Sequence, residues 1–153
     1  MKKNRILKIA ITFVIVVTAI GYYAYYEFNR TNDSLKNKQP AYVVSPSMII
    51  DEFSKNSTAA LQKYVDKVIE VEGQVKNIET TEKNDVTIVL GEENNMSSLR
   101  FSLDSNETKE ANIIKINAKV RLKGMCTGYN ADEMGLGSDI LLNRAIIVTN
   151  KNN

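Results

Sequence analysis

Apolar and polar residues alternate along five stretches of this chain, as they do in strands with one buried face. These stretches cover residues 68–76, 86–90, 98–103, 119–127 and 140–149. In the first, Ile69, Val71 and Val75 share one face with Gly73. A glycine inside a strand indicates a bend, a bulge or a close backbone approach, as at the corner of a small barrel. Gly124 has the same position in the fourth stretch, so Gly73 and Gly124 are predicted to be structural corner residues.

Apolar residues at helical spacing occur before the first strand and again between the third and fourth strands. Ser45 and Pro46 form a helix-start signal before Ile49 and Phe53, and a second start follows at Asn56. A further short helix is expected over residues 105–115. The order strand, strand, strand, helix, strand, strand is that of the OB barrel. The predicted fold class is therefore all-β with short helices, a five-stranded OB-fold barrel over residues 45–149 that is preceded by two short helices.

The first quarter of the chain follows another pattern. Residues 9–26 are 18 consecutive uncharged residues, and four cations without an acid stand in residues 1–8. With its apolar flank this run approaches the roughly 20 residues that a bilayer requires. The positive-inside rule then leaves residues 1–8 in the cytoplasm. The sequence predicts a single-pass transmembrane helix over 9–26 in the cytoplasmic (inner) membrane, with the N-terminus inside and the barrel extracytoplasmic.

A cleaved signal peptide is the alternative reading of the N-terminal segment. Residues 9–20 form a short apolar core, and Val17-Thr18-Ala19 offers a small-residue cleavage site. Four tyrosines between residues 22 and 26 favour an uncleaved anchor, because they resemble the aromatic belt at the end of a spanning helix. Residues 27–44 are predicted to be a flexible tether, and residues 150–153 a tail.

The composition of the chain limits which catalytic and metal-binding sites it can form. The chain has no histidine, and its single cysteine, Cys126, is expected to point inward as a small hydrophobic residue. Residues 1–44 hold 7 basic and 2 acidic side chains, whereas the remainder holds 13 basic and 16 acidic ones, so the net charge of +2 hides an acidic domain. The sequence predicts a protein that is not an enzyme, with no cofactor and no metal site.

The candidate ligand face is a set of five cationic or aromatic residues: Arg100, Lys119, Arg121, Lys123 and Tyr129. Lys119, Arg121 and Lys123 alternate on the outward face of the fourth strand, and could bind phosphate or anionic lipid. The competing interpretation is a self-neutralised ladder, because Glu70 and Glu72 face outward on the first strand, which pairs with the fourth in an OB barrel.

Three segments resemble a known family. These are Tyr64-Val65-Asp66-Lys67-Val68-Ile69-Glu70-Val71-Glu72-Gly73, Val120-Arg121-Leu122-Lys123-Gly124-Met125-Cys126-Thr127-Gly128 and Ile140-Leu141-Leu142-Asn143. They are similar to the bacterial OB-fold proteins of the tRNA-anticodon-domain-like (tRNA_anti-like) family. Members of that family usually have glycine where this chain has Asn117, and asparagine is the next-best residue for a left-handed turn. The resemblance implies an OB fold, and implies nucleic-acid binding by fold analogy alone.

The expected function is a membrane-anchored, non-enzymatic binding or interaction module of the bacterial envelope. Its partner is expected to be an envelope protein or a small ligand. A hydrolytic enzyme, which would require a cleft of carboxylates, is one alternative. Binding of single-stranded nucleic acid is the other. It is disfavoured because the domain is acidic, and because Phe101, the one aromatic residue on the second and third strands, is expected to point inward.

Overall fold

The computed structural model describes residues 2–28, 35–131 and 137–148, with side chains of the N-terminal helix described over residues 12–25. The chain divides into two units, Met1–Asp33 and Ser34–Asn153. The first contains helix α1 (Lys2–Phe28). Among the described residues, no helix is long and apolar enough to span a membrane, so the predicted span is not confirmed. Residues 29–34 of the predicted tether and the predicted tail 150–153 lie outside the described residues.

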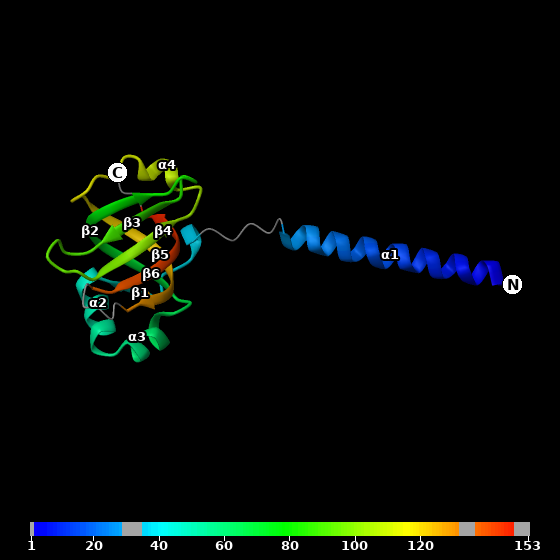
Figure 1. Ribbon diagram of the computed structural model, residues 1–153, viewed down its shortest axis with the longest axis horizontal. Helices are drawn as coiled ribbons and strands as arrows, with labels where there is room; N and C mark the ends of the chain where they lie inside the picture. The colour runs from blue at the N-terminus through cyan, green and yellow to red at the C-terminus, as the bar shows by residue number, and fades with distance from the viewer. Residues whose placement is uncertain (1, 29–34, 132–136, 149–153) are drawn as a thin grey trace. The chain divides into compact units, whose positions relative to one another are not determined.

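The second unit is built on a closed five-stranded barrel (Figure 1). Its strands are β2 (Val68–Thr80), β3 (Val86–Leu90), β4 (Ser98–Leu103), β5 (Lys119–Asn130) and β6 (Asp139–Ile147). They follow one another in the order β2-β3-β4-β6-β5, and pairing of β2 with β5 closes the ring. The β4–β6 pair is parallel, and the other pairs of the barrel are antiparallel. This arrangement confirms the predicted OB-type barrel.

The barrel core comes from the apolar side of each strand. Ile69, Val71 and Val75 of β2 are fully buried, as their alternation predicts. Phe101 of β4 points inward and is fully buried, which confirms its expected orientation. Cys126 is also fully buried, and burial raises the pKa of its thiol. It therefore acts as a small core residue, as expected.

Gly73 is a contact point between the barrel and helix α2 (Pro46–Lys55). A Cβ atom at Gly73 would lie 2.5 Å from Cγ of Pro46 and 3.6 Å from Cδ1 of Leu90. Among the described residues, Gly137 alone of the glycines has a positive φ, so an unusual backbone angle is not what Gly73 provides. It provides room for a proline ring. Gly124 has a similar role, since its Cβ would lie 3.1 Å from Cβ of Leu142.

Helices α2 and α3 (Ser57–Tyr64) cover one end of the barrel, and the short helix α4 (Thr108–Ala111) lies at the other end (Figure 1). Ser45 caps α2 by accepting a hydrogen bond from the Met48 N–H, as the start signal predicts. Phe53 is 1% exposed and stacks on Tyr64 and Tyr129 at centroid distances of 6.0 and 4.9 Å. The predicted pair of capping helices is confirmed.

The helix expected over residues 105–115 is shorter than predicted. Regular helix covers only Thr108–Ala111 and ends at the C-cap residue Asn112. The residues that follow, Ile113 and Ile114, are β-branched and favour helix weakly. Ile113 is left 81% exposed and Ile114 is only partly buried, so burial on the barrel does little to offset this weak preference.

Part of the predicted tether belongs to the folded unit. The 3-10 helix η1 (Leu35–Asn37) lies within it, and strand β1 (Tyr42–Val44) pairs in parallel with β2. Leu35 is 1% exposed, and the Tyr42 ring packs edge-on against Tyr64 at 5.0 Å. Burial of these side chains offsets the entropy of ordering the segment. The folded domain therefore begins about ten residues before the predicted boundary at residue 45.

Two local features of the strands agree with the sequence. The irregular alternation around Asn143 and Arg144 indicates a bulge, and Arg144 has a φ of 55° beside register shifts between β6 and its neighbours. Asn117, the residue that replaces the glycine of the family, has a φ of 68°. Its left-handed conformation directs the turn into β5, which is the role that the sequence predicts.

Candidate functional site

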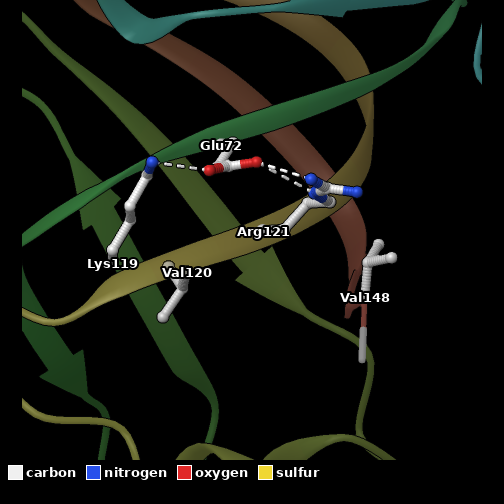
Figure 2. Close-up of a pocket in the computed structure, with 5 residues that line it drawn as sticks. All are labelled: Glu72, Lys119, Val120, Arg121 and Val148. Carbon is white, nitrogen blue, oxygen red and sulfur yellow. Dashed lines mark hydrogen bonds and ion pairs between the residues drawn. The ribbon is translucent and has the colours of Figure 1, made fainter. Parts of the chain in front are cut away.

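A ladder of opposite charges lies across β2 and β5. The register places Glu72 opposite Arg121, and Glu70 opposite Lys123. Figure 2 shows the Glu72 carboxylate between two cations, with Lys119 Nζ 2.7 Å from Oε1 and Arg121 Nη2 2.6 Å from Oε2. The self-neutralised ladder expected from the alternation is confirmed for Lys119 and Arg121.

The electrostatics of the ladder follow from these contacts. Hydrogen bonds from Lys119 and then Arg121 lower the pKa of Glu72 to about 2, and Glu72 in turn raises the pKa of Arg121. The same side chains, with Val120 and Val148, line a shallow pocket of about 230 Å³. An anion entering this pocket has to compete with a carboxylate that already binds both cations.

Glu72 is expected to stay ionised at a pH where an ordinary glutamate is protonated. Because its pKa is lowered in the folded state, its pairing stabilises the fold above the ordinary value of 4.5, and this contribution is lost as the pH falls toward 2. An NMR titration of the side-chain carboxyl is expected to show ionised Glu72 at pH 3. Lys119→Ala is expected to raise its pKa, whereas Lys67→Ala, at an exposed position outside the ladder, leaves it unchanged. A wild-type midpoint near 4.5 contradicts the pairing.

Lys123 occupies a different environment from Lys119 and Arg121. It is 7% exposed, and its Nζ donates hydrogen bonds to the carbonyl oxygens of Lys36 at 3.3 Å and Lys38 at 2.9 Å. Sequence alternation places it outward, but residues of the predicted tether cover it. Its ammonium group is therefore held by the chain itself.

Arg100 lies on the outer side of β3 and β4, the surface on which OB barrels commonly bind ligands. Its guanidinium forms ion pairs with Glu79 on β2 and with Asp139 on β6, the second at 3.6 Å. Ser98 donates a hydrogen bond of 2.5 Å to Asp139 from the same surface. Thr87 and Ser102 lie side by side there, with their hydroxyl oxygens 3.5 Å apart. This surface is polar, and its central cation is bracketed by two carboxylates.

Tyr129 lies at the end of the barrel that α2 and α3 cover, which we call the barrel floor. Its ring stacks on Phe53 with an interplanar angle of 27° and packs against the hydrophobic core. The five candidate residues therefore do not form one face: Lys119 and Arg121 share the ladder, while Arg100, Lys123 and Tyr129 each have separate surroundings. Within the described residues, no group of three or more histidine, cysteine or acidic side chains could hold a metal ion.

One functional contact was missed by sequence reasoning. Lys36, in the predicted tether, pairs with Glu107 at 2.7 Å, and Glu107 is only 2% exposed. This contact raises the pKa of Lys36. A signal for it existed in the sequence, because Leu35 is an isolated large apolar residue in a polar stretch.

Comparisons with solved structures show the same fold. A crystal structure of a protein described as a candidate nucleic acid-binding lipoprotein from Klebsiella pneumoniae matches with a TM-score of 0.54 and 13% identity. The match covers 70% of this chain and 92% of that one. An aspartyl tRNA synthetase from Entamoeba histolytica matches with a TM-score of 0.47 and 10% identity, over 79% of this chain and 24% of that one. At 13% identity the first of these likenesses concerns the fold alone.

Sequence comparison assigns the family. No curated protein matches the chain. The model of the family described as tRNA_anti-like matches residues 1–140, which is most of the chain. The closed barrel, its strand order and the left-handed Asn117 agree with the resemblance that the strand sequences show. The chain belongs to the tRNA_anti-like family.

Proposed function

We propose that this protein is a membrane-anchored, extracytoplasmic binding module that recognises a protein or small ligand of the bacterial envelope and catalyses no reaction. The observation that carries the proposal is the pairing of Arg100 with Glu79 and Asp139 on the outer surface of β3 and β4. A surface that binds polyanions needs cations that are free to contact phosphates. A mixed surface of hydroxyls and paired charges suits hydrogen bonding to a neutral or protein partner.

The lack of catalysis is inferred from the side-chain chemistry. The chain contains no histidine, the commonest general base. The carboxylates at the barrel surface that are described above are held in ion pairs, and the one thiol is buried. Carboxylates held in ion pairs and a buried thiol are not activated nucleophiles.

Single-stranded nucleic acid is the second candidate ligand. The family name and the description of the Klebsiella pneumoniae protein favour it. Against it stand the paired cations of both charged surfaces and the placement of Tyr129 in the barrel floor. Base stacking requires an exposed ring. Phe101 is fully buried, and Tyr129 is partly buried with its ring already stacked on Phe53.

A cross-linking experiment tests the proposed ligand surface. The full chain is cross-linked in its membranes and recovered with its partner, in the wild type and in two variants. Ser102→Arg places bulk and charge beside Arg100, and is expected to reduce recovery of the partner about tenfold or more. Ser54→Arg adds the same side chain at an exposed position of α2 and is the matched control. Undiminished recovery with Ser102→Arg contradicts the assignment of the surface.

Anchoring is a separate prediction of the proposal. It rests on the uncharged run of residues 9–26 behind four cations. The intact mass of protein extracted from membranes is expected to match the chain with residues 9–26 still attached. A mature species that begins at Ile20 contradicts the anchor and supports a cleaved signal peptide.

A further inference from the structure

Residues 35–38 lie on the barrel as a strap, which we define by these four residues. Leu35 is 1% exposed, although η1 is only three residues long. The Lys38 N–H closes the turn by donating to the Leu35 carbonyl at 3.1 Å. The strap thus has one apolar side chain that is buried within the folded unit.

Two buried charges of the barrel depend on this strap. Lys123 donates to the strap carbonyls of Lys36 and Lys38, and Glu107 accepts an ion pair from Lys36. Glu107 also accepts a hydrogen bond from the Ile147 N–H at 3.4 Å. A buried charge is costly unless it is paired, so removal of the strap leaves both groups in need of new partners. The strap therefore presents a cation to Glu107 and carbonyl oxygens to the ammonium group of Lys123.

The strap is nonetheless held less firmly than the strands. The described side-chain contacts of the strap include one buried leucine, one ion pair and the two hydrogen bonds from Lys123, whereas β5 is paired along its length with β2 and β6. The gain from burying a single leucine is smaller than the entropy cost of ordering four residues, so the leucine alone does not hold the strap. Segments with so few contacts open locally at a lower free energy than the whole domain unfolds.

We propose that the strap is a latch that opens while the barrel remains folded, and that its opening uncovers Lys123 and Glu107. An open pocket of about 440 Å³ already adjoins Lys123, and the strap residues Lys36 and Asn37 form part of its wall. Opening enlarges this pocket and exposes the ammonium group of Lys123. The latch lies between α1 and β1 in the sequence, so a force transmitted along the chain from its N-terminal segment acts on the latch before it reaches the barrel.

Hydrogen exchange of the full chain in detergent micelles tests the latch. The strap reporter is the amide of Lys38, and the barrel reporter is the amide of Cys126, which donates to the Lys67 carbonyl at 3.0 Å. After correction for intrinsic rates, the Lys38 amide is expected to be protected at least about tenfold less than the Cys126 amide. Protection factors that agree within tenfold show that strap and barrel open together, and overturn the proposal.

A pair of variants adds an independent check. Lys36→Met removes the cation that pairs with Glu107, and is expected to speed exchange at Lys38 about tenfold while leaving Cys126 unchanged. Lys63→Met removes an ion pair of the same 2.7 Å length, to Glu52 on the capping helices, and is expected to leave Lys38 unchanged. Equal acceleration of both reporters by Lys36→Met contradicts a separate latch. If Lys36→Met does not fold, the wild-type comparison decides alone.

Discussion

Replacing Gly73 with valine is expected to lower the free energy of unfolding by about 2–3 kcal/mol, because α2 leaves no room for a side chain there. A Cβ atom would lie 2.5 Å from Cγ and 3.2 Å from Cδ of Pro46. The proline ring is rigid and begins α2, so it cannot rotate away without moving the helix. Urea unfolding of the full chain in detergent micelles measures the effect.

Gly128→Val is the matched control for this substitution. It lies on β5, and no described atom beyond its chain neighbours comes within 4 Å of a Cβ atom there. Its expected change is below about 0.5 kcal/mol. Pro46→Ala in the Gly73→Val background is expected to recover part of the loss, because it removes the obstructing ring. A Gly73→Val midpoint equal to that of Gly128→Val shows that the contact with Pro46 is unimportant.

Replacing Phe53 with alanine is expected to cost about 3–5 kcal/mol of stability. Phe53 is 1% exposed and stacks between Tyr64 and Tyr129, so its removal leaves a cavity where α2 meets the barrel. Met48→Ala, on the same helix at a side chain that is 52% exposed, is expected to change stability by no more than about 0.5 kcal/mol. Thermal or urea unfolding of both variants provides the comparison, and similar midpoints contradict a role for Phe53 in fixing α2.

The strands were the part of this fold that could be predicted from the sequence. Alternation at period two sets which side chains point inward, and the predicted ranges of β3 and β4 agree with the structure. The same alternation, with the pairing expected of an OB barrel, placed Glu70 and Glu72 across from the cations of β5, and the structure adds the register that sets Glu72 opposite Arg121. Features that follow from the alternation along each strand and from the strand pairing of an OB barrel were therefore accessible before the structure.

Features that depend on contacts between distant segments were not accessible. The sequence indicates that Gly73 is special, but only the folded chain shows that Pro46 is the reason. Lys123 was predicted to be an outward cation, and the strap covers it because Leu35 finds a buried site on the barrel. Both contacts join segments that no local pattern relates to each other.

The same limit applies to the candidate ligand face. Five residues were selected because cations and an aromatic ring are typical of anion and nucleic-acid sites. Arg100 is one example. Its ion-pair partners Glu79 and Asp139 come from β2 and β6, and they decide whether its guanidinium is available to a ligand. The alternation shows which side of a strand a residue occupies, but not which side chains from other strands reach it.

A titration of the full chain with a fluorescently labelled single-stranded oligonucleotide, followed by anisotropy at about 0.15 M salt, tests most directly whether the paired charges exclude nucleic acid. The expected result is binding no tighter than about 10⁻⁴ M, the weak limit of ordinary non-specific binding. A variant with Glu79→Gln and Asp139→Asn frees Arg100, and is expected to bind more tightly than the wild type. The proposed neutralised surface is contradicted by micromolar binding of the wild type that weakens steeply with salt, provided that Arg100→Ala abolishes this binding and the control Lys109→Ala keeps it.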